Sequence, residues 1–159
     1  MLRITRFITL FLAALTTGMG LCHVLEMPAR MTWDQQLWVG STVHGGLYRL
    51  FGNVGAVIVV ATVIAALVLT WMVRGSGRAV WRTTALGAFM FCLALAGWWA
   101  MVFPVNVELA GWLDGPVPRD WAEYRLRWET GHAVNTLAQA IGLGLLYASV
   151  LLDTPRSAG

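Results

Sequence analysis

Four long apolar segments constrain the fold of this chain more than any other feature of its sequence. They cover about residues 4–27, 47–73, 81–103 and 125–152, and each is apolar on all sides rather than along one face. A helix needs about 20 apolar residues to cross the roughly 30 Å of hydrocarbon in a bilayer. Because lipid cannot hydrogen-bond to the backbone, and strand-like alternation is not seen, each segment is predicted to be a transmembrane helix.

The composition agrees with a membrane protein. Of the 159 residues, 58% are hydrophobic and 12% are charged, whereas a soluble domain has about 45–50% apolar and about 25% charged residues. The net charge of +3 comes from arginines spread along the chain, so there is no basic block to follow nucleic-acid phosphates. We therefore predict one all-α domain over residues 1–159, a four-helix transmembrane bundle whose partner is the lipid bilayer and not a nucleic acid.

The arginines also predict the orientation of the bundle. Arg74, Arg78 and Arg82 lie in or beside the short connection between the second and third segments, which is typical of a cytoplasmic loop. Both termini are then cytoplasmic, and we expect the bacterial inner (cytoplasmic) membrane. The two longer connections, 28–46 and 104–124, are then outer loops, and their tryptophans indicate segments at the level of the lipid headgroups. The first segment has no cleavage site after its apolar stretch and is expected to be retained as a helix.

Two pairs of ionisable residues lie within the apolar segments, where a charged group is costly. His23 and Glu26 lie near the end of the first segment, and Glu129 and His132 lie near the start of the fourth. The i, i+3 spacing places both members of each pair on one helix face. At about 1.5 Å per residue, His23 is about 28 Å from residue 4 and His132 is about 30 Å from residue 152. Because the first segment runs outward and the fourth returns inward, the two pairs are predicted to meet at one level near the outer surface.

Further polar and small residues continue both helix faces toward the inner end. Polar residues that faced lipid would have no explanation, so both helix faces are predicted to point into the bundle. The second and third segments carry fewer such residues and are predicted to act as walls. The residues concerned are Asn135, Gln139 and Gly142 after His132, and Thr16, Met19 and Gly20 before His23.

Three kinds of site suit these residues. His23, Glu26, Glu129 and His132 together could ligate one iron, copper or zinc ion with open positions. His23 and His132 could also be the axial ligands of a haem b. A ferritin-type di-iron site needs four carboxylates, whereas only Glu26 and Glu129 are well placed here, with Glu108 as the next candidate. A di-iron site is therefore disfavoured. The third alternative is an interior network of hydrogen bonds and ion pairs without any cofactor.

Two motifs flanking the last connection carry a family resemblance. They are FPVNVEL at 103–109 and RWETGH at 127–132, with Trp121 between them. Together with HVLEMP at 23–28, they resemble the anthrone-oxygenase-like family of small four-helix integral membrane proteins. The family pattern has an arginine three positions after the histidine of the second motif, where this chain has Asn135.

The resemblance implies an oxygenase that inserts oxygen from dioxygen into a lipophilic, electron-rich aromatic such as an anthrone, giving a quinone without a cofactor. His132 and Glu129 would then provide the base, with His23 and Glu26 beside them. Substrate or bound oxygen would be hydrogen-bonded by Asn106 and Tyr48. The alternative is a non-catalytic small subunit or assembly partner, in which the Trp-rich outer loops dock onto a larger membrane complex or a second copy of the chain.

Overall fold

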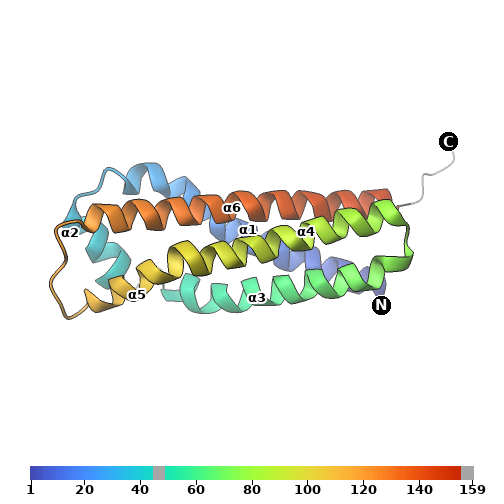
Figure 1. Ribbon diagram of the computed structural model, residues 1–159, viewed down its shortest axis with the longest axis horizontal. Helices are drawn as coiled ribbons and strands as arrows, with labels where there is room; N and C mark the ends of the chain where they lie inside the picture. Colours follow the sequence, from blue (N-terminus) through green and yellow to red (C-terminus); the bar gives the residue numbers. More distant parts are fainter. Residues whose placement is uncertain (45–48, 155–159) are drawn as a thin grey trace.

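The computed structural model describes residues 1–44 and 49–154, which form one elongated helical bundle (Figure 1). Its described residues contain four helices long and apolar enough to cross a membrane, and they contain no strand. The predicted all-α four-helix transmembrane bundle is therefore confirmed. The four spans are Leu2–Arg30, Phe51–Gly75, Arg78–Gly111 and Trp121–Leu152.

Shorter elements connect the long helices and cover one end of the bundle. A 3₁₀ turn joins the second span to the third, and Gly77 after it has a φ of 103°, a conformation that favours glycine. The third span contains a π-helical turn, and the outer connections contain two further short helices. In chain order the elements are α1 (Leu2–Arg30), α2 (Gln35–Val39), η1 (Gly40–His44), α3 (Arg49–Met72), η2 (Val73–Gly75), α4 (Arg78–Gly97), η3 (Trp98–Val102), α5 (Phe103–Gly111) and α6 (Trp121–Leu152).

Two prolines lie just past the predicted ends of the first and third segments, and neither ends its helix. α1 continues through Pro28 to Arg30, and the Met31 N–H closes the helix on the Met27 carbonyl at 2.9 Å. The third span continues past Pro104 because that proline occupies the first turn of α5, where a missing N–H costs little. Both helices therefore project further toward the outer end than predicted.

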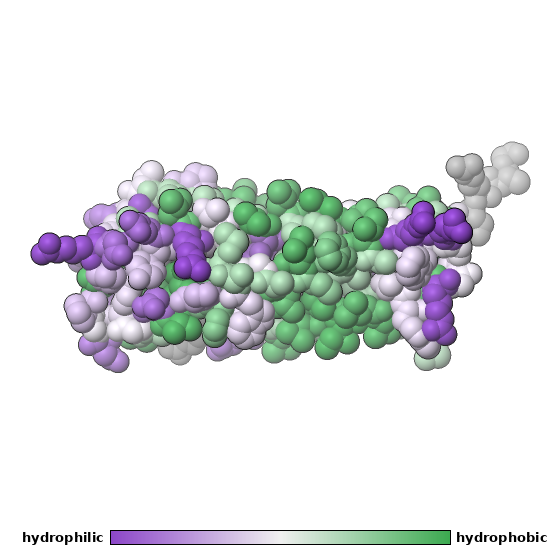
Figure 2. Space-filling model, in the orientation of Figure 1, coloured by the Kyte–Doolittle hydropathy of each residue, from purple (hydrophilic) through white to green (hydrophobic). Residues whose placement is uncertain are grey.

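The start of α1 and the end of α6 lie at the same end of the bundle, where Arg6 and Asp153 form an ion pair. The opposite end, called the outer end after the predicted orientation, carries α2, η1 and α5 (Figure 1). Figure 2 shows hydrophobic residues around the middle of the molecule and hydrophilic residues gathered toward its two ends. This distribution suits a protein that spans a bilayer. Which end faces the cytoplasm, and which membrane holds the protein, stay predictions.

The outer end contains a packed apolar core rather than a ring of tryptophans at the headgroups. Trp38 is fully buried and Trp112 is 6% exposed, so neither is the interfacial residue that the sequence suggested. Both connections fold back onto α6, and their indole rings fill the space between the helices. The buried members of this outer core are Trp38, Val39, Val102, Val105, Leu109, Trp112 and Trp128.

The inner half of the bundle is held by close contact between α4 and α6. A Cβ on Gly142 would lie 3.0 Å from the Gly87 carbonyl oxygen, and a Cβ on Gly87 would lie 3.0 Å from that of Gly142. Small residues at such a crossing let two membrane helices approach closely. Gly142 therefore faces the bundle interior, as predicted, and the rest of its helix face does so too.

Candidate functional site

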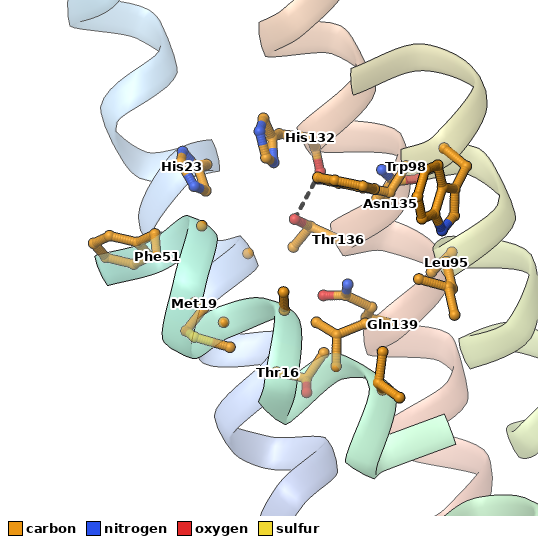
Figure 3. A pocket seen from close by; sticks show the side chains of 18 residues that line it. Thr16, Met19, His23, Phe51, Leu95, Trp98, His132, Asn135, Thr136 and Gln139 are labelled. Atoms are coloured by element: carbon orange, nitrogen blue, oxygen red, sulfur yellow. Dashed lines mark hydrogen bonds between the residues drawn. The ribbon is translucent and has the colours of Figure 1, made fainter. Parts of the chain in front are cut away.

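His23 of α1 and His132 of α6 lie side by side inside the bundle (Figure 3). Their ring centroids are 4.1 Å apart and the ring planes differ by 19°. The Trp128 indole packs edge-on against both rings, at 5.2 Å from His23 and 4.3 Å from His132. The prediction that these two histidines meet at one level is confirmed.

A cavity of about 360 Å³ extends from the histidine pair toward the inner end of the bundle. This volume is in the range of pockets that hold drug-sized ligands. All four long helices contribute to its wall, which is mainly apolar and includes Phe51, Leu95 and Trp98 (Figure 3). The predicted polar faces of α1 and α6 do point into this space, with Thr16, Met19 and Gly20 on one side and Asn135 and Gln139 on the other.

The cavity reaches the membrane-facing surface of the protein. Val60 of α3 and Trp99 of η3 line the cavity and are also 46% and 55% exposed. Ala56, one turn before Val60, likewise lines the cavity and is exposed. The part of the cavity wall between α3 and η3 is therefore the part that lies nearest to a lipophilic molecule in the bilayer.

Two buried amide side chains belong to the wall of the apolar cavity. Asn135 is 5% exposed and Gln139 is 9% exposed. Within the part of the chain that the structure describes, Asn135 Nδ2 and Gln139 Oε1 have no hydrogen-bond partner. Leaving a buried polar group unsatisfied costs about 1–3 kcal/mol. The pair thus places one unsatisfied donor and one unsatisfied acceptor at the wall of the cavity.

Glycines on neighbouring helices make room for these amides. A Cβ on Gly97 would lie 2.5 Å from Asn135 Oδ1, and a Cβ on Gly20 would lie 2.9 Å from Gln139 Oε1. Real Cβ atoms do not come so close to another heavy atom, so any larger residue would push the amides aside. The positions of Gly20 and Gly97 are therefore part of what shapes the cavity.

The two carboxylates predicted to join the histidines are engaged elsewhere. Glu129 Oε1 accepts hydrogen bonds from Arg30 Nε at 2.6 Å and from Trp38 Nε1 at 3.2 Å. The Glu26 side chain is 46% exposed, and its Oε2 is 3.8 Å from Arg30 Nη1. Across residues 1–44 and 49–154, no group of three or more His, Cys, Asp or Glu side chains is placed to hold a metal ion. The predicted four-residue metal set of His23, Glu26, Glu129 and His132 is not brought together.

The histidine pair also differs from a pair of haem ligands. Axial ligands approach iron edge-on from opposite faces of the porphyrin. His23 and His132 instead stack almost face to face at 4.1 Å, which leaves no space for a macrocycle between them. The arrangement places two imidazoles on the wall of a cavity, where their nitrogens are suited to proton transfer.

Arg30 is the residue at the site that the sequence did not predict. It is fully buried, lies over the Trp128 ring at 4.9 Å from its centroid, and donates to Thr42 Oγ1 at 3.0 Å. The predicted first segment ends at residue 27, which places Arg30 in the connection 28–46. Its position seven residues after His23 was the available signal, since two helical turns return to the same face.

The remaining predicted residues have different positions. Asn106 Oδ1 accepts a hydrogen bond from Trp128 Nε1 at 2.8 Å, so it supports the ring that packs on the histidines. Glu108 is exposed and does not line the cavity. Tyr48, predicted to contact substrate, lies outside the described residues.

The π-helical turn η3 has a local cause in the sequence. Pro104 has no N–H to donate to the Ala100 carbonyl, and the Arg127 side chain donates to that oxygen at 3.2 Å instead. The Phe103 N–H bonds to the Trp98 carbonyl, one residue further back than in an α-helix. Such π-turns occur often at functional sites, and here the turn carries Trp98 and Trp99 to the cavity wall.

The chain matches no protein-family model, no curated protein and no solved structure. The resemblance to the anthrone-oxygenase-like family, which the sequence motifs suggested, stays a prediction.

Proposed function

We propose that this protein is a membrane-embedded oxygenase that binds a lipophilic aromatic substrate in the cavity beneath His23 and His132. The observation that supports this proposal most is the position of the stacked imidazoles, 4.1 Å apart, on the wall of an apolar cavity that reaches the lipid-facing surface. Imidazole is the side chain best suited to proton transfer near neutral pH. Two of the motifs that carry the family resemblance, at 23–28 and 127–132, include these histidines.

The chemistry proposed needs a base, dioxygen and an acidic substrate. One imidazole nitrogen removes a proton from a CH₂ group that lies between two aromatic rings and is conjugated to a ketone. The resulting carbanion transfers an electron to dioxygen, and the two radicals combine to form a carbon–oxygen bond. The imidazolium returns its proton to the distal oxygen, which gives a hydroperoxide.

A second proton transfer completes the reaction. The imidazole removes the remaining proton from the same carbon, the oxygen–oxygen bond breaks, and the departing hydroxide takes that proton to leave as water. The substrate CH₂ and one dioxygen thus become a ketone and one water. The substrate is oxidised by four electrons, and the dioxygen is reduced by the same four.

The amides have complementary roles in this proposal. Deprotonation of such a ketone places negative charge on its oxygen, and a donor held in a site that excludes water stabilises that charge strongly. Asn135 Nδ2 is a buried donor on the cavity wall, and Gln139 Oε1 is a buried acceptor for a substrate hydroxyl. Glu129 is a positioning residue, because its carboxylate binds Arg30 rather than a histidine.

The proposal is tested with purified protein in lipid nanodiscs and anthrone as the probe substrate. Quinone formation is followed by absorbance and dioxygen uptake by an electrode, with spontaneous oxidation subtracted from both. We expect a rate proportional to protein concentration and one dioxygen consumed per quinone formed. The His23→Ala/His132→Ala variant is the matched baseline. An equal rate in the wild type and this variant would contradict the proposal.

Purification from native membranes tests the non-catalytic alternative. A small subunit or assembly partner would co-purify from native membranes in fixed ratio with other chains. A wild-type protein without oxygenase activity that co-purifies in this way would replace the enzyme proposal by that alternative.

A further inference from the structure

A second cavity, of about 390 Å³, lies on the other side of the histidine pair. Its wall comes from η1, α5 and the outer parts of α1, α3 and α6. Four residues line both cavities, so the histidines stand where the two cavities meet. The shared residues are His23, Phe51, Gly52 and His132.

The two cavities have different surroundings. The inner cavity lies between the long apolar helices and reaches the lipid-facing surface at Val60 and Trp99. The outer cavity lies at the end of the bundle where hydrophilic residues gather (Figure 2). Its wall includes the exposed residues His44 and Ala110, together with Leu113, which is 50% exposed.

The wall of the outer cavity also provides polar groups for water. Thr42, His44 and Asn106 belong to that wall. A space with several hydrogen-bonding groups holds water, whereas a space lined by aliphatic and aromatic carbon stays dry. The inner cavity also has hydrogen-bonding side chains, Asn135 and Gln139 among them, but most of its wall is aliphatic and aromatic carbon. The same histidine pair thus faces a more polar space on one side and a mainly apolar space on the other.

We propose that the outer cavity is a water-filled vestibule through which water and small hydrophilic molecules reach His23 and His132, while the inner cavity admits lipophilic molecules from the bilayer. The site is then two-sided, with lipid and aqueous access meeting at one pair of imidazoles. This arrangement follows from the two cavities and their surroundings and does not depend on the oxygenase reaction. If that reaction occurs, the vestibule also gives its water product a path out.

Cysteine labelling in nanodiscs tests the two-sided arrangement without measuring activity. Cys22 and Cys92, both free thiols, are first replaced by Ser and Ala. A single cysteine is then introduced as Leu109→Cys, buried on the wall of the outer cavity, or as Ala94→Cys, buried on the wall of the inner cavity. Each is treated with a charged methanethiosulfonate, which needs water, or with lipophilic N-ethylmaleimide.

The thiolate is the reactive species, and it forms where water reaches the sulfur. We expect the charged reagent to label Leu109→Cys at least tenfold faster than Ala94→Cys. N-ethylmaleimide also reacts with the thiolate, but it carries no charge and can enter an apolar space, so its preference for Leu109→Cys should be smaller. Equal rates with the charged reagent would mean one continuous water-filled space and would overturn the proposal. So would slow labelling of Leu109→Cys by that reagent when the denatured variant reacts fully.

Folding of each variant is checked by its elution volume and its unfolding temperature. If Leu109→Cys does not fold, Thr42→Cys takes its place, because Thr42 also lines the outer cavity and is partly buried. Failure of the oxygenase assay would leave these labelling rates unchanged, so the two proposals fail independently.

Discussion

Arg30 donates to Glu129 at 2.6 Å, and both side chains are buried, so this ion pair joins the end of α1 to the beginning of α6. Glu129 lies one helical turn before His132, and Arg30 lies two turns after His23. Trp38 donates to the same carboxylate and brings α2 into the connection. The ion pair therefore holds the two histidine-bearing helices together on the outer side of the imidazoles.

Breaking this ion pair should destabilise the protein strongly. Removing one partner of a buried pair leaves an uncompensated charge and typically costs about 3–5 kcal/mol. We expect Arg30→Ala and Glu129→Ala each to lose this much unfolding free energy, and Arg30→Met/Glu129→Leu to lose much less. Reversible unfolding in mixed detergent micelles measures the difference.

The matched control is the pair at the other end of the same two helices. The side chains of Arg6 and Asp153 are 15% and 26% exposed, and partly exposed pairs contribute about 1 kcal/mol or less. Asp153→Ala should therefore have a small effect. A loss for Glu129→Ala no larger than that for Asp153→Ala would show that the buried pair does not hold the helices together.

Replacing either histidine of the pair should remove turnover while leaving the fold intact. General acid–base catalysis contributes about 10²–10⁴-fold to a rate. We expect His132→Ala and His23→Ala to lower kcat for anthrone oxidation within this range, with unchanged helical circular dichroism. His44→Ala, which removes an exposed histidine, should keep the wild-type kcat. Full activity in both His23→Ala and His132→Ala would exclude these residues as the base.

The sequence predicted the histidine pair because membrane burial makes each polar residue informative. Helical rise and opposite chain directions placed His23 and His132 at one level, and periodicity placed Asn135 and Gln139 on the same interior face. The ion-pair partner of Glu129 could not be predicted in this way. Its partner, Arg30, lies beyond Pro28, and only the tertiary packing shows that the helix continues and delivers a guanidinium to the carboxylate.

The amide side chains of Asn135 and Gln139 should lower the free energy of unfolding and strengthen the binding of substrate. Replacing Asn135 or Gln139 by Leu removes a buried polar atom without a partner among the described residues and keeps a similar volume. We expect the unfolding free energy of each variant to stay the same or rise. In Asn135→Leu, KM for anthrone should increase about tenfold, equivalent to about 1.4 kcal/mol. In Gln139→Leu, the same increase is expected for a hydroxyanthrone, which has the hydroxyl that anthrone lacks. Kinetics and unfolding are measured on the same preparations. A variant that loses stability and keeps its KM would assign the amide a structural role instead.

The opening toward the bilayer can be closed by one side chain. Ala56 lines the cavity at the lipid-facing surface, and its neighbour Val57 is 70% exposed and does not line the cavity. Ala56→Phe should slow the binding of anthrone, and Val57→Phe should not. Stopped-flow quenching of protein fluorescence measures both association rates. Equal rates in the two variants would mean that lipophilic ligands do not pass between α3 and η3.

The tryptophans show where composition alone misleads. An indole near the end of a membrane helix usually lies at the headgroups, yet Trp38 and Trp128 are buried. Trp128 packs beside Arg30 and the histidines, and Trp38 packs against Trp128. A tryptophan that is buried between the helices and a tryptophan that lies at the headgroups can have the same neighbours in the sequence. Trp38 is buried because α2 packs against α6, and this packing depends on contacts between residues far apart in the chain.

The most direct test of the account is nitrogen NMR of the protein with ¹⁵N-labelled histidine. The chain has three histidines, so the spectrum is simple, and the His44→Ala variant assigns the exposed one. Adding anthrone without dioxygen should shift the ring-nitrogen resonances of His23 and His132 together and leave those of His44 unchanged. If the resonances of the pair do not move at saturating anthrone, or only those of His44 move, the cavity beneath the imidazoles is not the substrate site.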